Sequence, residues 1–252
     1  SYSIAIDELI FGCRAIRATN SFEKYNFPVG LENCRGGNCP TQTLVDAYEL
    51  KDSGERPDKK ADYDKNKPYY EGRDPRFEKT IAKNGDTKWP NWNETALETY
   101  QGGANAEPLS GGTPTGYYLK KYCQTSINTT TAKPTTDNHT WIIYRLGEFY
   151  LNYAEALFKY LGTAYATNNE FPIPANEMVS KTRRRTKVNM PKFPAGLDNK
   201  LWWEKYQNER MVELAFEGHR FWDVRRWKEG DKHFSSIDEM KIYKSGDSYS
   251  YR

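Results

Sequence analysis

The sequence predicts a mainly α-helical fold joined to a long irregular region. Apolar residues recur at helical spacing only in the later part of the chain, residues 141–230, which we expect to be helical. Residues 1–140 are instead dominated by loop-like stretches such as NKPYYEGRDPRF and QGGANAEPLSGGTPTGYY. The mean hydropathy is only -0.93, but 15% of the 252 residues are aromatic, and disordered chains are usually poor in aromatic residues. We therefore expect a folded protein with long polar loops.

Composition argues against several classes of protein. The formal net charge of +3 is too small for a dedicated nucleic-acid binder, which carries a larger or more clustered excess of Lys and Arg. No run approaches the roughly 20 apolar residues that a transmembrane helix needs. The three His residues are scattered, so we expect neither a metal nor a cofactor. The chain begins without Met and ends abruptly, so we expect a piece of a longer protein.

The loop-rich part is expected to hold a few short elements. Residues 40–50, PTQTLVDAYEL, predict a short helix, because a Pro stands near the start and the apolar residues fall on one side. FEKTIAK and YYLKKYC, at 77–83 and 117–123, predict short strands. In CRGGNC the Gly pair could bend far enough to let Cys34 and Cys39 form a disulfide, with free thiols as the alternative.

The helical part predicts three helices. The first covers residues 142–162, where Gly147 and Ala154 would let a partner helix approach closely. Its start also fits the first helix of a tetratricopeptide repeat. A second, Arg-rich helix is predicted at 175–188, and a long third helix at 201–230. The apolar stripe of the first helix comprises Leu146, Tyr150, Tyr153, Leu157 and Leu161.

The third predicted helix is unusually rich in charge. Glu209, Glu213 and Glu217 form a column at four-residue spacing, and such like charges repel unless cations lie beside them. Arg210 and Arg220 could supply these cations locally, and the Arg183–Arg185 run from the preceding helix could supply others. Asp223 has Arg226 three residues on. On one face, a packing stripe is expected from Met211, Leu214, Ala215, Gly218 and Trp222.

This charged stretch could be a nucleic-acid helix, a catalytic site or part of the fold. Residues 201–230 hold six basic and six acidic residues, so no excess of positive charge is left for phosphate. Paired glutamates could serve a glycosidase, but the general acid needs a raised pKa, and neighbouring Arg lowers it. We therefore interpret the stretch as an Arg–carboxylate network that ties helices together.

The same stretch, ERMVELAFEGHRFWDVRRWKEG, closely resembles the signature of the SusD/RagB-like family of nutrient-binding outer-membrane lipoproteins. The family pattern of Glu-Arg, then Glu-Leu-Ala-Phe-Glu, Arg-Phe, Asp and Arg-Arg-Trp falls on residues 209–227 without departure. Further matches, such as RDPRF, TGYYLKKY and YRLGEFYLNYAEA, follow in family order over roughly residues 7 to 245. The lipid-bearing Cys and the first helices of the family find no counterpart, so the chain resembles the C-terminal portion of such a protein.

The resemblance implies tetratricopeptide-like helix pairs on one side and irregular loops with short strands on the other. It implies that residues 1–252 belong to one domain of a longer protein, with the loop-rich part at 1–140 and the helical part at 141–230. It also implies a non-catalytic protein, lipid-anchored in the outer membrane and facing the exterior. Such a protein would pass oligosaccharide, bound on its loop side, to a SusC-like TonB-dependent transporter.

A glycan site needs exposed aromatic rings with polar side chains at their edges, because sugars present flat C–H faces ringed by hydroxyls. Trp89 and Trp92 lie in a Pro- and Asn-rich loop with no period that would bury them. The alternative is that these rings plug the loop against the rest of the fold. The candidate ligand-binding residues are Trp89, Asn91, Trp92, Asn93 and Tyr100, followed by Tyr69 and Tyr70.

Three other functions stay open. A peptide-binding member of the same family is the nearest alternative to glycan binding. A tetratricopeptide-like scaffold without a small ligand would require the loop at 84–118 to be packed. A glycoside hydrolase would require one of the glutamates of the charged helix to act as an acid.

Overall fold

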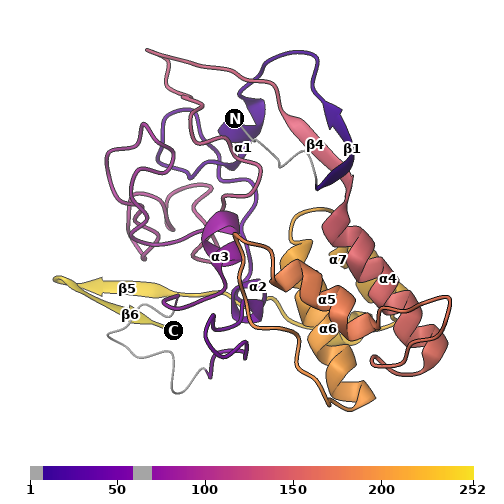
Figure 1. Ribbon diagram of the computed structural model, residues 1–252. Helices are drawn as coiled ribbons and strands as arrows, with labels where there is room; N and C mark the ends of the chain where they lie inside the picture. The colour runs from indigo at the N-terminus through magenta and orange to yellow at the C-terminus, as the bar shows by residue number, and fades with distance from the viewer. Residues whose placement is uncertain (1–7, 59–69) are drawn as a thin grey trace.

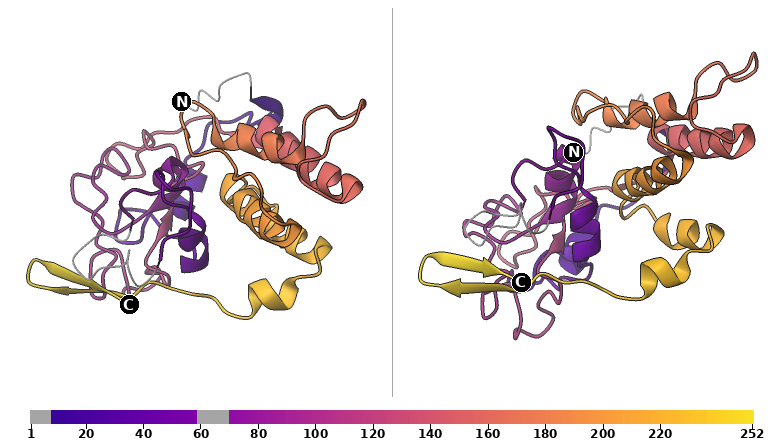
Figure 2. Two further views of the ribbon diagram at one scale, coloured as in Figure 1. Left: turned by 60° about the horizontal axis from the view of Figure 1, so that its bottom comes forward. Right: turned by 90° about the horizontal axis from the view of Figure 1, so that it is seen from below.

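The longer helices of the chain gather on one side of the molecule, and the loops lie on the other side together with a few short helices. The computed structural model describes residues 8–58 and 70–252. In Figure 1 the helices α4, α5, α6 and α7 lie together, while the segment between α1 and β4 winds through irregular loops beside them. The two turned views show the same separation (Figure 2). The prediction of a mainly helical fold with a long loop region and short strands is confirmed.

Two long helices and three shorter ones form the helical side. The first helix begins directly after a strand and ends at Gly162, whose left-handed φ of 73° suits a residue without a side chain. The third begins at Asp198, whose carboxylate accepts a hydrogen bond from the Leu201 amide at 2.8 Å, as a helix N-cap should. The helices are α4 (Leu146–Leu161), α5 (Ala175–Arg183), α6 (Asn199–Glu213), α7 (Arg220–Arg226) and α8 (Gly230–Phe234).

The long helix predicted at 201–230 is wrong, because the chain breaks between α6 and α7. Phe216 has a φ of 60° and Gly218 a φ of 83°, both in the left-handed region that ends a helix. The expected apolar stripe is therefore interrupted. Leu214 and Ala215 are buried, but the side chain of Trp222 is 67% exposed.

The buried face of α4 also differs from the predicted stripe. Leu151, Ala154, Leu157 and Phe158 are buried, so Leu157 is the one member of the predicted stripe on the buried face. The other members are half buried, namely Leu146, Tyr150, Tyr153 and Leu161. The Tyr rings can lie at the edge of the core with their hydroxyls toward water, so they do not need the innermost positions.

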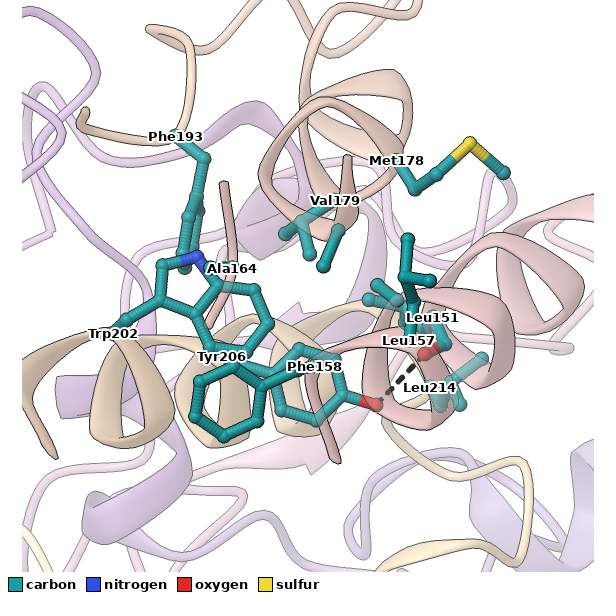
Figure 3. Close-up of a cluster of buried hydrophobic side chains, with 12 residues drawn as sticks. Leu151, Leu157, Phe158, Ala164, Met178, Val179, Phe193, Trp202, Tyr206 and Leu214 are labelled. Carbon is teal, nitrogen blue, oxygen red and sulfur yellow. Dashed lines mark hydrogen bonds between the residues drawn. The ribbon is translucent and has the colours of Figure 1, made fainter. Parts of the chain in front are cut away.

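A cluster of aliphatic and aromatic side chains forms the core of the helical side (Figure 3). The ring of Trp202 stacks on Tyr206 and on Phe158, with centroid distances of 5.4 and 4.6 Å. The buried Tyr206 hydroxyl donates to the Leu151 carbonyl at 2.9 Å, the dashed line in Figure 3. Helices α4, α5 and α6 are thus held together by apolar packing, and the hydroxyl of Tyr206, the one fully buried Tyr of the cluster, has a hydrogen-bond partner.

The loop side contains only short elements. No helix or strand described between residues 8 and 139 is longer than six residues. The first sheet pairs β1 antiparallel to β4, the second pairs β2 with β3, and the third is the β5–β6 hairpin. The elements are β1 (Leu9–Arg14), α1 (Ser21–Asn26), α2 (Gln42–Ala47), α3 (Pro75–Thr80), β2 (Ile81–Ala82), β3 (Tyr118–Leu119), β4 (Thr140–Arg145), β5 (Ile242–Ser245) and β6 (Ser248–Tyr251).

The short-element predictions are partly correct. The helix predicted at 40–50 is present as α2, and the strand predicted at 117–123 is present as β3. FEKTIAK is mostly helix α3 rather than strand, because Asp74 caps the Arg76 amide and Pro75 occupies the first turn. Only its Ile81 and Ala82 are strand.

Two further apolar clusters fill the loop side. One surrounds Tyr48, Phe77 and Tyr117, and the other surrounds Phe27, Trp89 and Tyr118. The long loops are therefore packed on apolar cores, the first of which they share with Val212 of α6. None of the helices in residues 8–58 and 70–252 combines the length and the apolar composition of a membrane span.

Candidate functional site

The charged stretch that stands out in the sequence lies inside the fold. Glu213 is 3% exposed, and its carboxylate lies 2.6 Å from a guanidinium nitrogen of Arg145 and 2.7 Å from those of Arg76 and Arg185. Burial alone would raise the pKa of Glu213, but these three guanidiniums hold it well below its usual value. A carboxylate held in the charged form cannot act as a general acid.

The other two glutamates of the column are held in the same way. Glu209 pairs with Arg76 at 2.7 Å and with Arg183 at 2.9 Å. Glu217 pairs with Arg145 at 2.7 Å and with Lys121 at 2.6 Å. Burial would raise the pKa of both carboxyl groups, but the neighbouring cations lower it. The cations therefore come from four separate segments of the chain, which the network joins.

Arg210 and Arg220 do not neutralise the column, contrary to the expectation from spacing. Arg210 pairs with Asp223 at 2.6 Å, and Arg220 lies 3.0 Å from the ring nitrogen of His233. Arg226 pairs with Asp223 at 2.9 Å and also contacts Glu155. The helix break turns Arg220 and Asp223 away from the column, so these residues form a second group between α4, α6 and α7.

Gly147 adjoins this network. A Cβ atom at Gly147 would lie 2.3 Å from a guanidinium nitrogen of Arg145 and 2.7 Å from a carboxylate oxygen of Glu213. The glycine therefore leaves room for the ion pair. The carboxylate of this pair comes from Glu213 of α6, and the expectation that Gly147 lets a partner helix approach closely stays a prediction.

The expectation that Trp89 is an exposed platform is also wrong. Its side chain is 5% exposed and packs edge-on against Phe27 at a centroid distance of 5.4 Å. Trp92 is partly buried against the same cluster, and its indole N–H donates to the Ile127 carbonyl at 2.9 Å. The side chain of Asn93 is buried and donates to the Thr95 carbonyl. A Trp ring gains more from burial in a loop core than from exposure to water.

The remaining candidates lie nearer the surface. Asn91 is exposed, and Tyr100 is half buried with its ring 5.9 Å from that of Tyr249. The half-buried ring of Tyr70 lies 4.7 Å from the ammonium group of Lys83. Tyr69 lies outside the described residues. A ligand-binding role for Asn91, Tyr100 and Tyr70 stays a prediction.

The disulfide considered for CRGGNC is not formed. Cys34 and Cys39 are both free thiols. The Cys34 sulfur lies 3.2 Å from the Thr129 hydroxyl, and the Cys39 thiol donates to the Gly36 carbonyl at 3.4 Å. Burial raises the pKa of the Cys34 thiol to about 11, which disfavours the reactive thiolate.

A polar pocket lies on the loop side, where β4 begins. Its volume is about 200 Å³. Gln124 and His139 line it and are more than nine-tenths buried, whereas Asn138, Asp137 and Tyr122 are half buried. The exposed Arg14 of β1 also lines it. We call this cavity the His139 pocket, and its lining residues are Arg14, Tyr122, Gln124, Asp137, Asn138, His139 and Thr140.

Residues outside the His139 pocket fix the positions of its lining residues. The Nε2 atom of His139 lies 2.9 Å from Oε1 of Glu23, a fully buried residue of α1. The same oxygen accepts a hydrogen bond from the backbone N–H of Gln124 at 2.9 Å. The His139 ring stacks on Trp141 at a centroid distance of 5.4 Å. Glu23 and Trp141 therefore fix the imidazole from its edge and its face, so the pocket is formed without a ligand.

A larger cavity, of about 440 Å³, lies beside α4 and α5. Its lining includes Glu8, Tyr150, Lys181 and Arg185. Glu8 and Arg185 are ion-paired with each other, and Lys181 lies over the Tyr150 ring. Because these groups already have partners, this cavity is a weaker candidate than the His139 pocket.

Sequence reasoning missed the His139 pocket. Its residues come from β1, from the segment at 122–124 and from the segment before β4, and they show no common spacing. His139 is one of only three His residues, but a single His in a loop does not indicate a ligand site. Among residues 8–58 and 70–252, no cluster of His, Cys, Asp and Glu could hold a metal ion.

The chain belongs to the SusD family, because the model of that family matches residues 8–251. A SusD-like protein from Bacteroides fragilis shares 26% identity with it, at a TM-score of 0.75 over 97% of this chain and 48% of the other. A SusD-like carbohydrate binding protein from the same species shares 24% identity, at a TM-score of 0.71 over 89% and 42%. The chain thus spans about half the length of these structures or less. None of the curated proteins is similar enough in sequence to match it.

Proposed function

We propose that this chain is part of a protein that binds oligosaccharide at the cell surface without changing it chemically. Membership of the SusD family is the observation that leads to this function. One of the two similar structures is described as a carbohydrate-binding protein, which agrees with the proposal. The full protein would be lipid-anchored in the outer membrane, face the exterior and deliver its ligand to a TonB-dependent transporter.

The charged network supports binding rather than catalysis. All three glutamates of the column are paired with Arg or Lys, and their pKa values are lowered. An inverting or retaining glycosidase needs one carboxylic acid with a raised pKa, close to a second carboxylate. The described residues of the column do not provide such an acid.

The loop side offers a better candidate ligand site than the charged network does. Polar side chains line the His139 pocket, and a half-buried Tyr stands among them. Sugar sites combine such hydrogen-bonding groups with aromatic faces. The aromatic loop at 84–118 contributes less than its sequence suggests, because its Trp residues pack into the loop core.

A glycan array followed by calorimetry on the best ligand tests the proposed function. We expect binding to at least one oligosaccharide, with no release of reducing sugar on prolonged incubation. Release of reducing sugar would contradict the non-catalytic role. Binding of peptides but of no glycan would show a different ligand class.

A further inference from the structure

Unpartnered hydrogen-bonding atoms are concentrated at the His139 pocket. In the described part of the chain, seven buried side-chain nitrogen or oxygen atoms lack a hydrogen-bond partner. Four of the seven belong to this one group of residues, namely Glu23 Oε2, Gln124 Oε1, Asn138 Oδ1 and His139 Nδ1. Buried polar atoms are nearly always paired in folded proteins, so this concentration indicates a partner that the chain itself does not supply.

The three unpartnered atoms on the lining residues are acceptors. His139 Nε2 faces a Glu23 oxygen at 2.9 Å, and a carboxylate only accepts, so Nε2 carries the hydrogen. In the neutral imidazole, Nδ1 is then an acceptor. The side-chain nitrogen Nε2 of Gln124 donates to the backbone carbonyl of Asn138 at 3.4 Å, which leaves the side-chain oxygen Oε1 of Gln124 as the free end. The Asn138 side chain adds a second amide oxygen.

A partner of these atoms must bring several donors. The hydroxyls of a neutral sugar do so, and each can also accept. A sugar carboxylate would bring only acceptors and would place its charge near Glu23 and Asp137. The single cation on the lining, Arg14, is exposed and stands on β1.

The volume of the pocket limits the size of the ligand that it can bind. Ligand pockets for drug-sized molecules usually hold about 300–1,000 Å³, and this one holds about 200 Å³. One sugar ring fits such a volume better than a chain of rings does. The terminal amides of Gln124 and Asn138 turn readily about their last torsion angle, so they can align with the hydroxyls of that ring.

We propose that the His139 pocket binds one neutral sugar residue of the glycan through its hydroxyls, with Gln124, Asn138 and His139 as acceptors. This inference rests on the proposed function and assigns its ligand class and its residues. We therefore expect neutral oligosaccharides to bind more tightly than oligosaccharides of uronic acids.

The test compares two kinds of oligosaccharide on matched variants. Calorimetry measures neutral glucan, xylan and mannan fragments and acidic oligogalacturonates on the wild-type chain. Gln124→Met removes the acceptor while keeping the side-chain length, and Gln101→Met makes the same change at an exposed position. We expect Gln124→Met to weaken binding of the best neutral fragment about tenfold. Binding by Gln101→Met should equal that of the wild type.

A second pair of variants separates lost hydrogen bonding from a damaged fold. Asn138 is only half buried. Asn138→Leu removes its acceptor, whereas Asn138→Asp keeps an acceptor oxygen. We expect the Leu variant to lose binding while it unfolds at the temperature of the wild type, and the Asp variant to keep most of the binding. If Gln124→Met does not fold, this pair decides the question.

Three results would overturn the inference. If glycans bind but Gln124→Met and Asn138→Leu bind them as the wild type does, the pocket is not the site, and the proposed function stands. If oligogalacturonates bind at the pocket as tightly as neutral fragments, the ligand class is wrong. If no fragment of either kind binds, both the proposed function of this chain and the inference fail.

Discussion

The positions of single side chains separate the structural aromatic residues from the candidate ligand residues. Trp89 and Trp222 show the contrast. Trp89 stands in a Pro-rich loop and is buried, whereas Trp222 stands in a helix and is 67% exposed. Loop or helix position alone therefore does not tell which ring is available to a partner, because burial depends on the residues that other segments bring.

Replacing Trp89 should reduce stability rather than act on the ligand alone. We expect Trp89→Ala to lower the free energy of unfolding by about 3–5 kcal/mol, because it leaves a cavity beside Phe27. Trp222→Ala, the exposed control, should change it by less than about 0.5 kcal/mol. Urea unfolding followed by circular dichroism measures both. Equal stability of the two variants would show that Trp89 is not a core residue.

At the scale of elements, the ion network joins segments that are far apart in the sequence. Glu209 and Glu213 stand on α6, Arg76 on α3, and Arg183 at the end of α5. Each helix thus contributes a charged end or face to one buried group. Removing one partner of such a group leaves an uncompensated buried charge. The network therefore favours the arrangement of the helices in which every charge is paired.

Replacing Gly147 tests this packing, because helix propensity and the ion pair should have opposite effects on stability. A Gly-to-Ala change inside an exposed helix stabilises by up to about 1 kcal/mol. At Gly147 the added Cβ meets the ion pair of Arg145 and Glu213, so we expect Gly147→Ala to destabilise by about 1–3 kcal/mol.

The control for this prediction is Gly230→Ala at the start of α8, where a Cβ would meet nothing within 4 Å. Thermal unfolding of the two variants measures the difference. A Gly147→Ala variant as stable as the wild type would show that the network has room to move.

At the scale of the whole molecule, the network makes stability depend on pH. The pKa values of Glu209, Glu213 and Glu217 are lowered in the folded protein, against about 4.3 for an unfolded Glu. The unfolded chain therefore takes up protons first as the pH falls. The stability that the three carboxylates contribute is complete above the unfolded pKa and is lost as the pH falls toward the folded values.

We expect the free energy of unfolding to decrease steadily between about pH 5 and pH 3. Urea unfolding at a series of pH values measures it. Glu213→Gln, which removes one of these titrating groups, should show a shallower decrease from a lower starting stability. A free energy that stays constant over this range would contradict the buried charge of the column.

Two of the main helices could be predicted from sequence, although residues 142–145, predicted as the start of the first, belong to strand β4. The period of apolar residues predicted α4 and α5, and the density of paired charges at 209–227 predicted ion pairs with the Arg-rich segment. Both signals are local or nearly so. The helix break at Leu214–Gly218 was missed, because Phe216 has no sequence signal for a left-handed conformation.

The proposed ligand site could not be predicted in the same way. The Trp residues of the loop look available in sequence, but the loop folds back and covers them. The His139 pocket forms only when β1, the segment at 122–124 and the start of β4 meet, at separations of more than a hundred residues for Glu23 and His139.

The sequence by itself thus determined the family, the helical side and the composition of the charged network, because periodicity and motif spacing act over one or two helical turns. The tertiary structure alone decided which cations neutralise each glutamate, which Trp rings are buried and where unpartnered acceptors gather. The physical reason is that burial and pairing depend on distances between remote segments, which no local pattern encodes.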